Sequence, residues 1–396
     1  MIEFNLAEAK KYLDIFYNTN LSLSKKGKFD NYALQLVGLP GIGKTEIVRK
    51  YAEEIGVECH VIRLSQFDEL SQLVGYPFIE ISIHKDGNKL HINEKHLTDY
   101  IKNGWQPCDE KSRMAYSQPE WVGKIKEGDI LFFDDFSRQI GVFNNAVMEI
   151  IKEKENLGWS LPNGVSVFLS SNPNNGEYDI RQGLDDAQAD RIIPIYIKWD
   201  KHIWAKYADE IGIPSEFINF ILLNTEAISG SQSEKFENSS TARRWTNFFI
   251  QCSLIYPDIK NKLPEITELG LLHVGSTINL FVNFIKENYD RIVSPEELMD
   301  HTIPLSKVLD RVKESIQINP VKEISIRNII TFRLTNFILK IINNKSISIG
   351  PEIKNRIKDL VLSELFEKDN IAVLLKTLAT DGRFNSLTLE LSSKIL

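Results

Sequence analysis

The chain has 396 residues, enough for two or three domains, and its 42% hydrophobic and 26% charged residues are ordinary globular values. The net charge of -7 gives no overall positive field for nucleic acid, and the 3 cysteines form no disulfide framework. We find no cleavable signal and no apolar run near the roughly 20 residues that span a bilayer, so we expect a soluble cytoplasmic protein.

Residues 7–18 predict an amphipathic helix at the start of the chain. Helical spacing recurs at 42–55 and 140–155. Between these helices lie short apolar runs without polar alternation, as expected for strands buried on both faces: 32–37, 57–64, 129–133, 165–169 and 192–197. Strands of this kind separated by helices predict an α/β fold with a parallel sheet.

Residues 82–127 break this pattern, because they are polar and rich in turn formers. We interpret them as an insertion or a long loop, with one short helix. After about residue 200 the chain becomes helical, with a polar loop at 229–240. A last helical section begins at Ser294, which has Glu297 three residues later, the spacing of a capping box.

The stretch GLPGIGKT satisfies the pattern GxxxxGK[ST] between a predicted strand and a predicted helix. Its glycines let backbone N–H groups turn toward phosphate oxygens, and the helix offers its positive N-terminal end. Lys44 would reach the β- and γ-phosphates, and Thr45 would hold Mg²⁺. A glycine-rich turn without a ligand is the alternative. The predicted nucleotide contacts are Gly38, Pro40, Gly41, Ile42, Gly43, Lys44, Thr45 and Glu46.

Polar residues follow two of the other predicted strands. The stretch LFFDD, residues 131–135, supplies Asp134 as the predicted metal-binding acid of the P-loop site, and the next residue, Asp135, is placed to act as a general base for water. Asn172 follows the strand at 165–169, where a neutral amide can align the attacking water. The alternatives are that the two aspartates cap the next helix and that Asn172-Pro173 forms a turn.

The order GLPGIGKT, LFFDD, SSNP, LDDAQADR and STARRW resembles the MoxR-like branch of the AAA+ ATPases over roughly residues 30–285. The resemblance implies ATP and Mg²⁺ as cofactors and Asn172 as the sensor-1 residue. It also implies Arg191 as an arginine finger and Arg243, with Arg244 beside it, as the sensor-2 arginine. It implies a nucleotide-binding domain at 1–200, an α-helical lid at 201–290 and a further helical region at 291–396.

Two positions depart from the family pattern. Asp135 stands where the family usually has glutamate, and Ala242 replaces the proline before the sensor-2 arginine. Aspartate is one methylene shorter than glutamate, so its carboxylate has a shorter reach toward the attacking water. Slow hydrolysis, or hydrolysis that depends on a partner, therefore stays open.

The resemblance implies that Arg191 completes the site of a neighbouring copy, which requires a ring, a hexamer by family, or another head-to-tail assembly. It also implies a remodelling or chaperone-like ATPase with a von Willebrand A-domain partner. Two alternatives remain: a nucleotide-gated assembly module with little turnover, and a DNA-processing motor or loader. The acidic net charge does not indicate nucleic acid, and no membrane association is expected.

Overall fold

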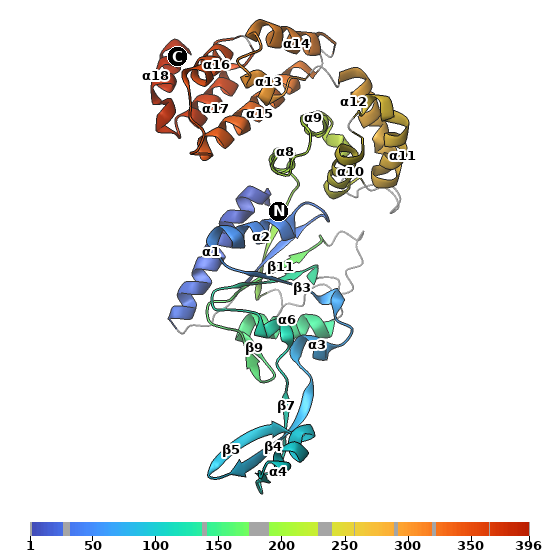
Figure 1. The fold of residues 1–396 in the computed structure, drawn as a ribbon, viewed down its shortest axis with the longest axis vertical. Helices are drawn as coiled ribbons and strands as arrows, with labels where there is room; N and C mark the ends of the chain where they lie inside the picture. The colour runs from blue at the N-terminus through green and yellow to red at the C-terminus, as the bar shows by residue number, and fades with distance from the viewer. Residues whose placement is uncertain are drawn as a thin grey trace. The chain divides into compact units, whose positions relative to one another are not determined.

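The computed structural model describes residues 2–26, 32–136, 141–173, 190–228, 240–256, 258–288, 292–318, 322–363 and 365–395 (Figure 1). They form two compact units, Met1–Trp199 and Asp200–Leu396. Each unit is described by itself below.

The first unit is built on a six-stranded sheet in which every neighbouring pair is parallel. Parallel pairing places all the carboxyl ends of the strands at one edge of the sheet. This architecture confirms the predicted α/β fold. The strand order is β1 (Glu3–Phe4), β12 (Ile192–Ile197), β2 (Ala33–Gly38), β11 (Ser166–Ser171), β8 (Ile130–Asp134) and β3 (Cys59–Arg63).

Helices cover both faces of this sheet (Figure 1). Successive side chains of a strand point to opposite faces, so each strand contributes to two cores. In β8, Phe132 packs with the first pair of helices, whereas Leu131 and Phe133 pack with the second pair. The first pair is α1 (Leu6–Lys25) and α2 (Lys44–Ile55), and the second is α3 (Leu70–Val74) and α6 (Gly141–Glu153).

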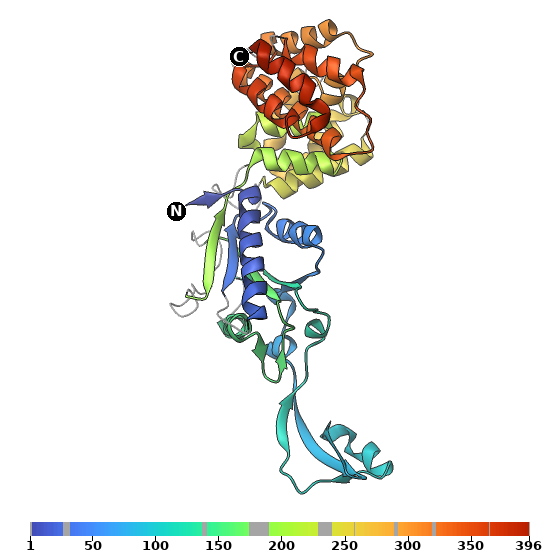
Figure 2. The ribbon, with the colours of Figure 1, turned by 90° about the vertical axis from the view of Figure 1, so that its left-hand side faces the viewer.

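Residues 77–116 form a small antiparallel sheet, which the sequence pattern did not predict, together with a short helix, which it did (Figure 2). Alternate residues Ile79, Ile81 and Ile83 lie on one face of its central strand. The polar residues that resemble a loop in the sequence occupy the other face, where Glu80 pairs with Arg113 across the sheet. Its elements are β4 (Pro77–Lys85), β5 (Asn88–Asn93), α4 (Leu97–Lys102), β6 (Gln106–Pro107) and β7 (Arg113–Tyr116).

Three short elements complete the first unit. Helix α5 (Glu120–Gly123) leads from the insertion back toward β8. Strands β9 (Glu155–Asn156) and β10 (Trp159–Ser160) form an antiparallel hairpin after α6. The Trp159 ring packs edge-on against Trp121, with 5.4 Å between ring centroids, which ties the hairpin to α5.

The second unit is helical throughout its described part. Its first half packs around an aromatic cluster in which Trp245, Phe248 and Phe249 are fully buried. The helices are α8 (Lys201–Glu210), α9 (Ser215–Leu223), α10 (Ala242–Ile255), α11 (Leu263–Val274), α12 (Ile278–Asn288), α13 (Pro295–Met299), α14 (Leu305–Ile318), α15 (Glu323–Asn343), α16 (Pro351–Val361), α17 (Lys368–Leu378) and α18 (Asn385–Ile395).

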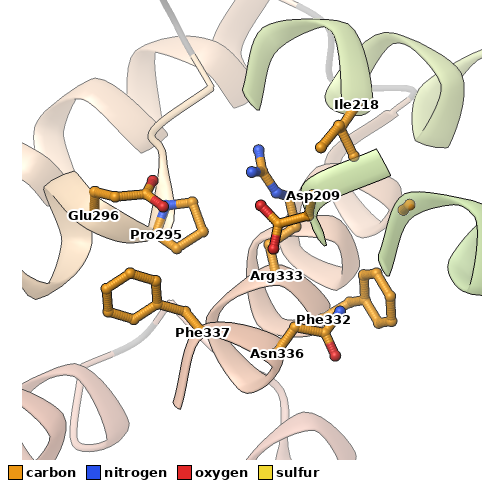
Figure 3. Close-up of a pocket in the computed structure, with 9 residues that line it drawn as sticks. Asp209, Ile218, Pro295, Glu296, Phe332, Arg333, Asn336 and Phe337 are labelled. Carbon is orange, nitrogen blue, oxygen red and sulfur yellow. The ribbon is translucent and has the colours of Figure 1, made fainter. Parts of the chain in front are cut away.

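A buried arginine joins the two halves of this helical unit (Figure 3). Arg333 on α15 donates to the Ser215 carbonyl oxygen at 3.0 Å and to Asn219 Oδ1 at 3.0 Å, both on α9. Burial lowers the pKa of its guanidinium, and the nearby Asp209 and Glu296 carboxylates oppose that change. The cavity beside it is about 10 Å³, no more than one water molecule needs, so it has no room for a larger ligand.

Among the described residues, one segment, Lys260–Lys286, is long and apolar enough to cross a membrane by length and composition alone. It contains α11 and α12, separated at Gly275. Ile266, Ile278 and Phe281 are fully buried within the unit. A core helix of a soluble protein passes the same test, so the segment is weak evidence for a membrane span.

Candidate functional site

The glycine-rich loop connects the end of β2 to the start of α2, at the carboxyl edge of the sheet. Gly41 and Gly43 have φ values of 79° and 102°, which favour glycine. At Gly38 a Cβ atom would lie 2.7 Å from the Ile197 carbonyl oxygen, so no side chain fits there. The loop is therefore closed tightly, with Ile42 buried beneath it.

Lys44 begins α2 and is buried, with its side chain folded back over the loop. Its Nζ donates to the carbonyl oxygens of Gly38 at 2.6 Å and Leu39 at 3.0 Å, and to Asn172 Oδ1 at 3.3 Å. These oxygen partners mark the position that phosphate oxygens would take beside the ammonium. Glu46, in the same first turn of α2, is exposed, and Pro40 is half-buried in the loop.

Thr45 and Asp134 lie together although they are 89 positions apart in the chain. The Thr45 hydroxyl lies 3.1 Å and 3.0 Å from the two Asp134 carboxylate oxygens. A hydroxyl and a carboxylate are the hard oxygen donors that Mg²⁺ prefers, and such sites usually complete the shell with phosphate and water. The residues present therefore fit ATP with Mg²⁺.

Two further residues contact Asp134 that the sequence reasoning missed. Ser170 Oγ donates to Asp134 Oδ1 at 2.7 Å, and Arg63 Nε lies 3.5 Å from Asp134 Oδ2. Ser170 is the penultimate residue of β11 and Arg63 is the last residue of β3, the two strands that flank β8, and Arg63 pairs directly with Asp134 in the sheet register. Both residues lie at the carboxyl ends of predicted strands, where ligands bind in open α/β sheets, and this position is the sequence signal that could have identified them.

Asp135 has a left-handed backbone with φ of 55°. Aspartate adopts this region more readily than most residues other than glycine. The Asp135 backbone N–H donates to Ser170 Oγ at 2.9 Å. The two adjacent aspartates thus share one serine hydroxyl.

Asn172 and Arg191 lie at different edges of the sheet. Asn172 is buried just past β11, within reach of Lys44 at the carboxyl edge. Arg191 precedes β12 at the amino edge, where its carbonyl oxygen accepts from the backbone N–H of Ala33 at 3.0 Å. The P-loop begins at the other end of β2. At about 3.3 Å per residue, the distance along this strand from Ala33, beside Arg191, to the start of the P-loop is about 16 Å, which is farther than an arginine side chain extends.

The remaining predicted arginine belongs to the second unit. Arg243 is exposed in the first turn of α10, which Thr241 caps through the Arg244 backbone N–H. The Arg244 side chain instead donates to the His273 carbonyl oxygen at 3.4 Å. Residues 137–140, which follow LFFDD and Phe136, and residues 174–189, which hold most of LDDAQADR, lie outside the described residues.

A group of possible metal ligands, Glu58, His60 and Asp129, lies at the amino edge of the sheet. Asp129 accepts from His60 Nε2 at 2.8 Å and from the backbone N–H groups of Lys126 and Glu58. Burial raises the pKa of the Asp129 carboxyl, but these hydrogen bonds outweigh it and lower the pKa overall. Both carboxylate oxygens are thus already engaged, and the group fastens the loop before β8.

Comparison with known proteins supports the fold. Residues 33–182 match the AAA domain of the dynein-related subfamily. No curated protein matches the sequence. The chain is similar to the structure of a RuvB mutant from Thermotoga maritima, with 13% identity and a TM-score of 0.37, over 77% of this chain and 85% of that one.

NtrX from Brucella abortus, in a structure with ATP, is also similar, with 11% identity and a TM-score of 0.36, over 82% of this chain and 64% of that one. Both TM-scores are low, so the fold assignment depends on the sheet, the P-loop and the matched family. The first unit therefore has the parallel sheet and P-loop of the AAA+ fold, and its residues 33–182 match the AAA domain.

Proposed function

We propose that the first unit binds ATP with Mg²⁺ and hydrolyses it, and that a neighbouring copy of the chain completes the site. The observation that carries the proposal is the meeting of Thr45, Asp134 and Lys44 at one edge of the sheet. The Thr45 hydroxyl lies 3.0 Å from the Asp134 carboxylate, and Lys44 Nζ lies 2.6 Å from the P-loop carbonyl of Gly38.

Each residue has a role that its position allows. Bound ATP with Mg²⁺ supplies the γ-phosphate that water attacks. Lys44 balances the charge of the phosphates, and Thr45 with Asp134 holds the metal. Asp135 accepts the proton of the attacking water, and Asn172 orients that water from the next strand.

The position of Arg191 supports a shared site. It lies at the amino edge of the sheet, opposite the P-loop, so it has no route to the nucleotide of its own chain. An arginine supplied by a neighbour stabilises charge in the transition state and contributes about 10³- to 10⁵-fold in rate. We therefore propose a head-to-tail ring that remodels a partner protein, as the resemblance to MoxR-type ATPases implies. A von Willebrand A-domain partner and a cytoplasmic location are parts of the same proposal.

The first test is binding of a fluorescent ATP analogue, with Lys44→Ala as the blank. Wild-type protein should bind the analogue, and the variant should lose at least about tenfold in affinity because it loses a charge-assisted phosphate contact. Equal binding by both proteins would place the nucleotide elsewhere and reject the assigned site.

Mixing two inactive variants tests the shared site. Arg191→Ala keeps an intact P-loop site, and Asp135→Asn keeps an intact arginine. Neither should hydrolyse ATP alone. An active interface needs the P-loop site of the Arg191→Ala variant and the arginine of the Asp135→Asn variant. If the two variants mix at random in equal amounts in a head-to-tail ring, about one quarter of the interfaces meet this condition. Activity recovered on mixing supports the trans arginine, whereas no recovery despite co-assembly rejects it.

A second candidate is a nucleotide-gated assembly module with little turnover. The short Asp135 side chain favours it, because its carboxylate reaches less far than the usual glutamate. ATP that binds, drives assembly and is not hydrolysed above the Lys44→Ala blank at any protein concentration would select this candidate. A DNA-processing motor would instead bind DNA with an affinity that falls steeply with salt.

A further inference from the structure

One serine hydroxyl links the two acidic residues of the proposed ATP site. Ser170 is fully buried at the end of β11. Its Oγ donates to Asp134 Oδ1 at 2.7 Å and accepts from the backbone N–H of Asp135 at 2.9 Å. The hydroxyl has one O–H group, which donates its hydrogen bond to the Asp134 carboxylate. The two contacts together therefore fix the orientation of the hydroxyl.

The sheet register explains why the serine is there. Leu169 pairs with Phe133 in the parallel ladder between β11 and β8, so Ser170 continues the strand beside Asp134. The next residue, Ser171, is also buried, but its Oγ accepts from Gln35 Nε2 at 3.0 Å, toward β2. Adjacent serines thus point to different neighbours, and only Ser170 faces the acids.

The contact with Asp135 also bears on its backbone. Asp135 turns out of the strand with φ of 55°, a conformation that needs support in a residue other than glycine. The hydrogen bond from its N–H to Ser170 supplies that support. Without the hydroxyl, a half-buried backbone donor loses its acceptor at the point where the chain turns.

We infer that Ser170 is a positioning residue of the ATP site, which holds the metal-binding carboxylate of Asp134 and the backbone of Asp135 in fixed relation. The inference rests on the proposed function. Ser170 acts through its two neighbours, Asp134 and Asp135, and is assigned no contact of its own with nucleotide or metal. Partners that orient metal ligands typically contribute about 10- to 100-fold in metal affinity or activity, as a general range.

The test compares Ser170→Ala with Ser171→Ala, the matched control one residue away. Binding of a fluorescent ATP analogue is measured without Mg²⁺ and then across a Mg²⁺ titration. Without Mg²⁺ both variants should bind as wild type does, because the P-loop is unchanged. The Mg²⁺ concentration for half-maximal effect should rise about tenfold in Ser170→Ala, and not in Ser171→Ala.

Steady-state hydrolysis gives the second readout. Ser170→Ala should lower kcat about tenfold or more while KM for ATP at saturating Mg²⁺ stays within about twofold. Ser170→Thr keeps the hydroxyl and should restore the wild-type Mg²⁺ dependence. If Ser170→Ala does not fold, Ser170→Thr and Ser170→Cys carry the comparison, since the thiol is only a weak donor.

The outcomes separate this inference from the proposed function. Equal Mg²⁺ dependence and kcat in Ser170→Ala and Ser171→Ala would overturn the role of Ser170 and leave the ATP site standing. Wild-type protein that binds no nucleotide would overturn the proposed function and, with it, this inference. The role of Ser170 is supported if the Mg²⁺ requirement rises only in the Ser170 variants that lack the hydroxyl.

Discussion

Lys154, directly after α6, provides a quantitative test of the structure. Its backbone is left-handed with φ of 57°, and its Nζ atom is buried without a hydrogen-bond partner in the described part of the chain. Burial lowers the pKa of this amine to about 7 from its ordinary 10.5. Replacement by methionine keeps the length of the side chain and removes the group that must lose its charge.

The pKa difference sets the size of the effect. At about 1.4 kcal/mol per pH unit, a pKa of about 7 against 10.5 costs the folded state up to about 5 kcal/mol. The unfolded chain binds the proton more tightly, so this cost is full below pH 7 and shrinks as pH rises toward 10.5. Lys154→Met should therefore stabilise the first unit most at pH 7 and below, and by less than about 1 kcal/mol at pH 10.

The assay must report on this region, because a chain of two units does not unfold in one step. Hydrogen exchange of peptides from α6 and the β9–β10 hairpin measures the local opening free energy. At pH 7 the variant should gain at least about 2 kcal/mol, and the gain should fall by about 1.4 kcal/mol per pH unit above that. Lys152→Met, at a side chain that is 54% exposed, is the control and should change little.

The reasoning would be refuted by a gain that does not depend on pH. Such a result would mean that the methionine stabilises by packing and that the Lys154 amine is not held neutral. Loss of stability at pH 7 would be a stronger contradiction, since it would show that the charged amine has a favourable partner.

Three further substitutions test the site. Gly38→Ala places a Cβ atom 2.7 Å from the Ile197 carbonyl oxygen, so nucleotide affinity should fall at least about tenfold, whereas Gly123→Ala, with open space around it, should be neutral. Arg63→Gln removes a cation 3.5 Å from the Asp134 carboxylate, which then binds Mg²⁺ without a competing positive charge. Because Arg63 is half-exposed, the half-saturating Mg²⁺ concentration should fall by no more than about fivefold. A rise in that concentration would mean that Arg63 contacts the phosphates. Asp135→Asn should lower kcat about 100-fold or more with unchanged ATP affinity in the binding assay; unchanged hydrolysis would exclude Asp135 as the base.

The insertion shows where sequence patterns were insufficient. Polar residues and turn formers dominate its composition, so the segment resembles a loop, although its central strand alternates apolar and polar residues as a half-buried strand does. Only cross-strand pairs such as Glu80 with Arg113 show that the polar residues share one face of a sheet. Such pairs join residues far apart in the chain, and local propensity does not report them.

The sequence by itself determined the features that are local or depend on burial alone. GLPGIGKT predicts the P-loop because strand, loop and helix are contiguous, and unbroken apolar runs predict the parallel sheet. The tertiary structure decided which polar residues meet. Strand order and register bring Thr45, Ser170 and Arg63 onto Asp134 from three other strands or helices, and Ser170 supports the left-handed backbone of Asp135. These contacts join residues up to 89 positions apart, and only the pairing of strands in space specifies them.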